Sequence, residues 1–167
     1  CSGCSAKEEP KQEKEQQEQI QPQSTENTEI EDGEDAKTDT ETKETDEVGD
    51  IQKELAKIEE QSIGYENADW SSMGQADMNQ TTAQWYQLWD DELNFLWSRL
   101  SDELDAETKA KVLEEQRAWI KQKEARVKGA GMEVNGGSLQ PQLENTVAEE
   151  ITRARAYILA GYLADVR

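Results

Sequence analysis

The residues best suited to acid and base chemistry are three consecutive carboxylates, Asp90, Asp91 and Glu92. Hydrolysis of a glycosidic bond needs one carboxyl group that donates a proton and a second that acts as base or nucleophile on the other side of the bond. Neighbouring positions on a helix point in different directions, which argues against such a pair here. The chain also lacks histidine, and its only cysteines are Cys1 and Cys4. Ser-His and Cys-His catalysis are thus excluded, and we expect no enzyme activity.

The overall charge limits the classes of molecule that this chain can bind. The chain has 38 acidic and 18 basic residues, a net charge of -20. Nucleic acid phosphates and anionic lipid headgroups repel so negative a chain, so we expect no nucleic acid partner. The absence of histidine removes the commonest metal ligand, and we expect neither a metal site nor a cofactor. A cationic partner suits this charge best.

The first 50 residues differ in composition from the rest of the chain. They contain 17 acidic and 5 basic residues, and their only large aliphatic residues are Ile20, Ile30 and Val48; the first aromatic residue is Tyr65. Such a segment cannot bury enough apolar surface to offset the entropy of ordering it. The composition therefore predicts a disordered acidic tether over residues 1–50, with a root-mean-square span of roughly 40 Å.

The opening residues Cys1, Ser2 and Gly3 resemble the product of lipoprotein signal peptidase, which cuts directly before a lipid-modified cysteine. Two acyl chains on Cys1, added before the signal peptide is removed, would anchor the protein on the outer side of the cytoplasmic membrane. The alternative is that the chain starts here arbitrarily. If Cys1 carries the lipid, it cannot form a disulfide with Cys4, so Cys4 is either a free thiol or itself modified. No apolar run approaches the roughly 20 residues of a spanning helix, so we expect membrane attachment through the lipid alone.

After residue 50 the apolar residues recur every three or four positions, which predicts an all-α fold. Ile51, Leu55 and Ile58 indicate a short helix that Asp50 could cap, within a segment of short helix and linker over residues 51–72. This helix either packs on the domain or extends the tether.

Residues 73–167 are predicted to form the folded domain, a small antiparallel bundle of about three long helices. The first has the strongest periodicity, the second follows a cap at Asp105 and ends near Gly129 and Gly131, and the third runs from Leu139 to the end of the chain. The first is marked by Met78, Thr82, Trp85, Trp89, Leu93, Leu96, Leu100 and Leu104. Tryptophans at 85, 89, 97 and 119 fit this core better than a ligand cage, which is the alternative.

Two of these helices carry a dense pattern of polar, aromatic and aliphatic residues: Asp90, Glu92, Leu93, Asn94, Trp97, Gln116, Arg117, Ala118, Trp119 and Ile120. Residues 75–79 precede this pattern, and Gly136 to Ser138 with Thr152 and Arg155 follow it. In this order and spacing the residues resemble the N-terminal domain of the LprI-type lysozyme inhibitor family, small exported helical proteins that are often lipoproteins.

The chain departs from the family pattern at several positions. The family commonly has cysteines where this chain has Thr81, Val127 and Val147, which implies that helix packing must suffice without those cross-links. Trp97 replaces a usual tyrosine, and Lys123 with Glu124 replaces an arginine-aspartate pair, which keeps the charges but not a bidentate contact.

Asp90 and Asn94 lie one helical turn apart, and Arg117 lies on the next helix. We expect these three to form a polar cluster that bridges the helices and fixes their register, and we favour this structural role for the signature residues over direct contact with a partner. For partner contact, exposure favours the connection around Gly131, Asn135 and Ser138.

The resemblance implies a surface-tethered lipoprotein that binds and inhibits a cationic lysozyme and so protects the cell wall. An acidic domain on a tether would attract such an enzyme before contact. The alternative is a non-enzymatic scaffold or interaction module of the envelope that binds peptidoglycan or another cell-wall protein. A hydrolase is the least favoured hypothesis.

Overall fold

The computed structural model describes the backbone of residues 40–166 and the side chains of residues 49–166. The described chain folds into four long helices, and it contains no strand. The prediction of an all-α bundle is confirmed. Most of the predicted tether, with Cys1 and Cys4, lies outside the described residues.

The first helix, α1, spans Thr40–Glu66 and is longer than the short helix predicted after Asp50. Its first eleven residues fall within the segment predicted as tether. A helix already held by packing extends at little cost, because each added residue contributes one further hydrogen bond. Apolar spacing alone could not show this extension.

The short 3-10 helix η1, Trp70–Ser72, joins α1 to α2. Asp69 holds this turn because its carboxylate accepts hydrogen bonds from the hydroxyls of Ser71 and Ser72. These bonds favour the charged form and lower the pKa of Asp69. The connection therefore presents a fixed negative charge.

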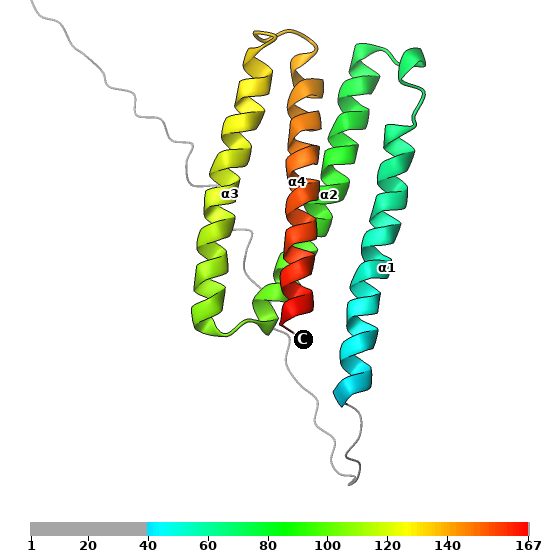
Figure 1. The fold of residues 1–167 in the computed structure, drawn as a ribbon. Coiled ribbons are helices and arrows are strands. Elements are labelled where there is room, and N and C mark those ends of the chain that lie inside the picture. The colour runs from blue at the N-terminus through cyan, green and yellow to red at the C-terminus, as the bar shows by residue number, and fades with distance from the viewer. Residues whose placement is uncertain (1–39, 167) are drawn as a thin grey trace, which may run out of the picture. The chain divides into compact units, whose positions relative to one another are not determined.

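Helix α2 spans Gln75–Glu103, α3 spans Ala106–Met132 and α4 spans Gln140–Asp165. Two residues connect α2 to α3, and the second, Asp105, caps α3 as predicted: its Oδ1 accepts 3.0 Å hydrogen bonds from the backbone nitrogens of Glu107 and Thr108. The turn after α3 contains Asn135 and Gly136, both with positive φ, and α4 has a proline in its first turn. Successive helices run antiparallel (Figure 1).

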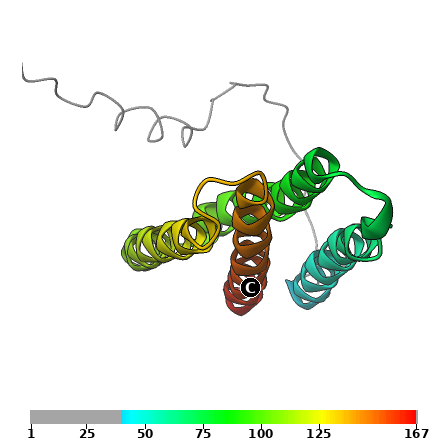
Figure 2. The same cartoon turned by 90° about the horizontal axis from the view of Figure 1, so that it is seen from above.

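The two central helices of the bundle are α2 and α4, which run in the same direction and pack most extensively against each other (Figures 1 and 2). Helix α1 packs on the flank of α2, and α3 packs on the flank of α4. The two helices with the shortest connection, α2 and α3, are therefore not the main packing pair. The fourth helix beyond the three predicted is α1, which packs on the domain.

The core lies where α1 and α4 meet α2. Trp89 and Leu96 of α2 are fully buried, as are Leu159 and Leu163 of α4, while Ile51 is the most buried aliphatic residue of α1. Trp85, Trp97 and Trp119 are partly buried and pack against this core. Of the four tryptophans predicted as core, three lie on α2 at helical spacing, and all four pack in or against the core and form no cage.

Amide side chains fix the first turns of α2 and α4 beside each other. The Gln75 side-chain nitrogen donates a 2.9 Å hydrogen bond to the side-chain oxygen of Gln142. The Asn145 side-chain nitrogen lies 3.3 Å from both the Thr82 hydroxyl and the Asn79 carbonyl oxygen. These bonds hold the α1–α2 connection and the α3–α4 loop at one end of the bundle (Figure 1).

Candidate functional site

A polar cluster joins α2 to α3 around Asp90, a residue of the family-like pattern. The Tyr86 hydroxyl donates a 3.2 Å hydrogen bond to Asp90 Oδ1, and the Asn94 amide lies 3.3 Å from Oδ2. From α3, Lys123 Nζ donates a 3.0 Å hydrogen bond to the Tyr86 hydroxyl and forms an ion pair of 3.8 Å with Asp90. Lys123 Nζ also lies 5.0 Å from the centroid of the Trp119 ring. The predicted bridge between these helices is therefore present.

The cation of this bridge is Lys123, and the prediction that Arg117 fills this role is wrong. Arg117 is exposed and forms an ion pair of 2.7 Å with Glu114 on its own helix. The inward face of α3 carries Gln116, Trp119 and Lys123, at spacings of three and four residues, and Arg117 lies outside this stripe. The lysine that stands in place of the family's usual arginine is thus the bridging residue.

The three neighbouring carboxylates of α2 face three different environments. Asp90 belongs to the polar cluster, whereas Asp91 is exposed and accepts a 2.7 Å hydrogen bond from Gln87. Glu92 is buried on the side of α2 that faces α1, beside Glu54. The predicted divergence is confirmed, and these side chains offer no acid and base pair to a common substrate.

Two buried glutamates lie in the packing of α1 against the rest of the bundle. Burial, together with the hydrogen bond to Glu54 and its charge, raises the pKa of Glu92 to about 8 despite the opposing charge of Arg99. Burial likewise raises the pKa of Glu149 on α4 to about 7, against the charge of Arg153. Each has one side-chain oxygen without a hydrogen-bond partner. These groups face other helices and do not line an open pocket.

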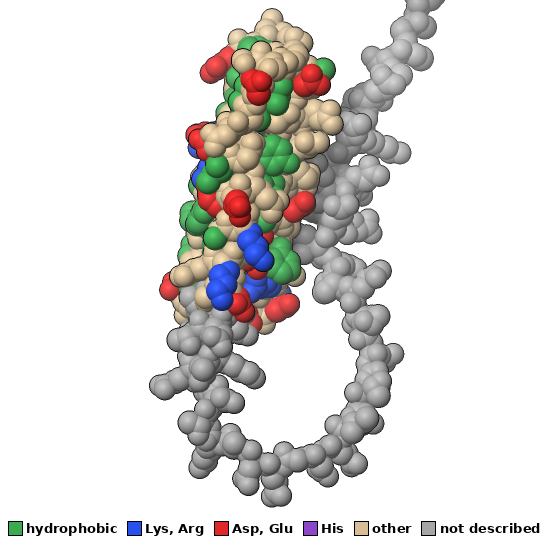
Figure 3. Space-filling model, turned by 90° about the vertical axis from the view of Figure 1, so that its right-hand side faces the viewer, with side chains coloured by type: hydrophobic (Ala, Val, Ile, Leu, Met, Phe, Trp, Pro, Cys, Tyr) green, Lys and Arg blue, Asp and Glu red, His purple; other side chains and the backbone are tan. Residues whose placement is uncertain are grey.

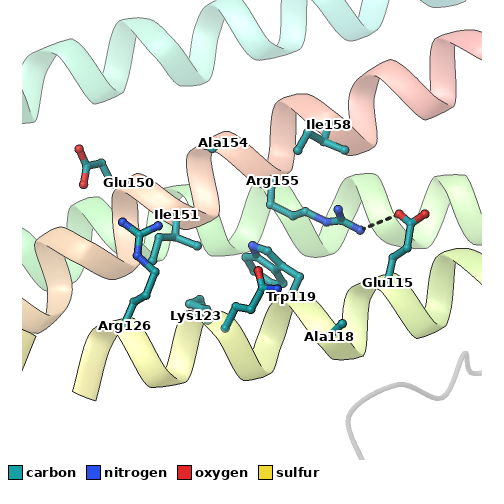
Figure 4. Close-up of a pocket in the computed structure, with 11 residues that line it drawn as sticks. Glu115, Ala118, Trp119, Lys123, Arg126, Glu150, Ile151, Ala154, Arg155 and Ile158 are labelled. Atoms are coloured by element: carbon teal, nitrogen blue, oxygen red, sulfur yellow. Dashed lines mark ion pairs between the residues drawn. The ribbon is translucent and has the colours of Figure 1, made fainter. Parts of the chain in front are cut away.

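A groove of about 740 Å³ runs between α3 and α4, with the ring of Trp119 between the two helices (Figure 4). At its floor, Arg155 Nε donates a hydrogen bond to Oε1 of Gln116, and Nη2 lies 3.5 Å from Glu115. Glu115 also accepts a 3.0 Å hydrogen bond from the Tyr162 hydroxyl. Arg155 and Gln116, both in the family-like pattern, thus pair with each other and hold α4 on α3. This supports a structural role.

The signature residues that remain are apolar and lie on α2. Leu93 is buried in the core, and Trp97 packs against its edge. All eight residues predicted as a family signature lie on α2 and α3. They divide between core packing and links between helices, except that Arg117 and Asn94 are exposed.

The α3–α4 loop holds the three residues predicted for partner contact, and the structure separates them. Asn135 and Ser138 are exposed, whereas Gly131 is buried. A β-carbon on Gly131 would lie 2.0 Å from Oε1 of Glu144, so this glycine allows close packing at the start of the loop. Exposure was inferred from sequence position alone, and for Gly131 that inference is wrong.

The α3–α4 loop lies at one end of the bundle and is the most exposed apolar part of that end. We call this end of the bundle the loop end. It comprises residues 64–79, from the last turn of α1 to the first turn of α2, and residues 129–143, from the last turn of α3 to the first turn of α4. Four exposed carboxylates occur in these residues, and they contain no lysine or arginine: Glu66, Asp69, Asp77 and Glu133. Figure 3 shows the α1 side of this end, where acidic and hydrophobic side chains are visible and basic ones are not.

Helix α3 has the opposite charge balance. It carries seven basic and four acidic residues, whereas α2 carries one basic and six acidic residues. The domain is therefore electrically asymmetric, and a cationic partner is attracted to the loop end and the α2 side more than to α3.

Residues 40–166 offer neither a metal site nor a membrane-spanning helix. Within that range, no three carboxylate, cysteine or histidine groups come together as a metal site. None of the helices in the same range has the length and apolarity to cross a bilayer.

Two polar residues that organise these sites were not predicted from the sequence. Tyr86 precedes Asp90 by one helical turn, a spacing that could have indicated the pair. Ser62 is buried on α1 and accepts hydrogen bonds from two tryptophans, but a serine in a polar segment gives no such signal.

Comparison with known proteins adds to this geometry. Neither the curated proteins nor the solved structures contain a match to the chain. A family model described as lysozyme inhibitor LprI matches residues 66–159, which is more than half of the chain and covers α2, α3 and most of α4. The chain therefore belongs to the LprI family of lysozyme inhibitors.

Proposed function

We propose that this protein binds and inhibits a cationic lysozyme outside the cytoplasmic membrane, where a lipid on Cys1 and an acidic tether hold the helical domain at the surface. Membership of the LprI family over residues 66–159 is the observation that carries the proposal. The net charge of -20 supports it, because it favours encounter with a cationic enzyme.

The proposed inhibition needs no chemistry by the inhibitor itself. A lysozyme cleaves a glycan chain bound in an open cleft, and a rigid protein placed over that cleft excludes the chain. The bundle suits this role because the Asp90 cluster and the Gln116–Arg155 pair connect its helices. Rigid binding surfaces lose little conformational entropy on association.

The test is lysis of peptidoglycan by a cationic c-type lysozyme, with and without the full chain lacking its lipid, at low and at moderate salt. We expect inhibition that rises with dose and persists at moderate salt, since close contact is screened less than long-range attraction. An unrelated acidic protein of similar net charge serves as the control. Inhibition that moderate salt abolishes, or that the control protein matches, would contradict the proposal and leave the envelope scaffold as the function.

The anchor requires a separate test in cells. A chain made with its natural signal peptide and labelled with a radioactive fatty acid should carry the label, and Cys1→Ser should remove it while Cys4→Ser retains it. Equal label on the wild-type chain and on Cys1→Ser would contradict lipid attachment at Cys1.

A further inference from the structure

We infer that the loop end is the surface that docks on the lysozyme, with Met132 and Glu133 at the centre of the contact. This inference rests on the proposed function and adds to it the location and chemistry of the interface. It joins the α3–α4 loop to the α1–α2 connection, which sequence analysis did not associate with partner contact.

Charge is the first reason for this choice. The loop end has four exposed carboxylates and no lysine or arginine. A cationic enzyme meets no like charge there, whereas it meets seven basic residues along α3. Like charges placed together in an interface are costly, so α3 disfavours the same partner that the loop end attracts.

Apolar exposure is the second reason. Met132 is 69% exposed and Leu139 is 38% exposed, at the two ends of the loop. Met132 is more exposed than any other large hydrophobic residue in the described chain. Apolar side chains surrounded by polar ones are typical of the centre of a protein interface, and methionine adapts to irregular surfaces.

Rigidity is the third reason. Between the two apolar residues, Asn135 has φ 48° and Gly136 has φ 82°, and Gly137 N donates a 3.2 Å hydrogen bond to the Val134 carbonyl. The side-chain nitrogen of Asn79 on α2 donates a 3.0 Å hydrogen bond to the Ser138 carbonyl and so fixes the loop to the other half of the loop end. A loop held in one conformation pays little ordering entropy when it binds.

The groove between α3 and α4 is a weaker choice for this partner. Its wall contains Lys123 and Arg126, and its Arg155 and Glu115 are paired with each other. Groups that already have partners must give them up before they bind anything else. The loop end has no such requirement at Glu133, which is exposed at the end of α3.

The experiment compares variants of the full chain for binding to the same c-type lysozyme by isothermal titration calorimetry at moderate salt, and for inhibition of lysis. Met132→Ser and Glu133→Lys alter the loop end. Ile120→Ser and Asp102→Lys make the same kinds of change at exposed positions of α3 and of the last turn of α2, away from the loop end. Circular dichroism of each variant checks that the bundle is intact.

We expect each loop-end variant to weaken binding about tenfold and each matched control to change it by less than about twofold. Loop-end variants that bind as well as their controls, while the wild-type chain still inhibits, would overturn the docking surface and leave the proposed function intact. A wild-type chain that neither binds nor inhibits would overturn both. Weak binding by the controls alone would place the interface on the sides of the bundle and contradict the inference.

Discussion

The indole Nε1 of Trp89 donates a 3.0 Å hydrogen bond to the hydroxyl of Ser62, and this bond joins α2 to α1 inside the core. Trp85, one turn earlier, donates a second hydrogen bond of 2.7 Å to the same oxygen. Ser62 is 1% exposed, so no solvent replaces these bonds. Helix α1 lies almost entirely before the residues matched by the family, yet it accepts hydrogen bonds from one buried and one partly buried donor of the family domain. We conclude that α1 is part of the folding unit.

Replacement of Ser62 by alanine should destabilise the bundle. It leaves two indole N–H groups without an acceptor, of which that of Trp89 is buried, and a buried unpaired donor costs about 1–3 kcal/mol. We expect the free energy of unfolding to fall by about 2 kcal/mol or more in urea denaturation. Ser98→Ala, at an exposed position of α2, is the control and should change stability by less than about 0.5 kcal/mol. Equal stability of the two variants would mean that the Ser62 bonds do not hold α1.

The buried glutamates should make stability decrease as pH rises. The pKa values of Glu92 and Glu149 are raised from 4.5 to about 8 and about 7, so the folded state favours their protonated forms. Their contribution is complete below the unfolded pKa and is lost as pH rises through the folded values. A difference of one pKa unit between the folded and unfolded states corresponds to about 1.4 kcal/mol, so we expect the free energy of unfolding to fall by several kcal/mol between about pH 5 and about pH 9, measured by urea denaturation.

Glutamine variants separate this effect from general charge repulsion. Glu92→Gln and Glu149→Gln should each flatten the pH profile, because neither side chain then titrates. Glu60→Gln makes the same change in charge at an exposed position of α1 and should keep the wild-type slope. If the free energy of unfolding of the Glu92 and Glu149 variants depends on pH as steeply as that of the control, the raised pKa values are contradicted.

Lys123 and Arg117 should differ in their effect on stability. Lys123 links α3 to Asp90 and Tyr86 on α2, whereas Arg117 pairs within one turn of its own helix. We expect Lys123→Met to lower the free energy of unfolding by about 1 kcal/mol, and Arg117→Met to change it by less than about 0.5 kcal/mol. Thermal unfolding of both variants gives the comparison. A larger effect at Arg117 would restore it as the bridging residue.

Asn135 should tolerate glycine but not a branched residue. Its φ of 48° lies in the left-handed region, where asparagine and glycine are accepted and β-branched side chains are strained. Asn135→Val should destabilise the domain by about 1–2 kcal/mol in thermal unfolding, and Asn135→Gly, the matched control, should be nearly neutral. If valine is tolerated as well as glycine, the loop is not held in this conformation.

The helices could largely be predicted from the sequence because their apolar periodicity is strong. The stripe from Thr82 to Leu100 is buried as expected except for the partly buried Trp85, and Asp105 caps α3. The start of α1 at Thr40 could not be predicted, since a polar helical segment has no apolar period. The central pairing of α2 with α4 could not be predicted either, because short connections indicate the relative direction of two helices but not which helices pack most closely.

The candidate site was less predictable than the fold. Spacing along α2 correctly paired Asp90 with Asn94, but the choice between Arg117 and Lys123 depends on the rotation of α3 about its axis. Sequence position alone placed Gly131 in an exposed loop, although it is buried and its missing side chain leaves room for the Glu144 side chain of α4. The loop end could not be predicted from the sequence, because its two segments, residues 64–79 and 129–143, are distant in the chain and meet only in the fold.

The most direct test of lysozyme recognition is calorimetric titration of the full chain into a cationic c-type lysozyme, with and without a saturating N-acetylglucosamine trisaccharide in the cleft of the enzyme. We predict saturable binding with one inhibitor per enzyme at moderate salt, and a marked loss of binding when the trisaccharide is present. Absence of saturable binding, or binding of equal strength with the cleft occupied, would contradict the claim that this protein inhibits by covering the cleft.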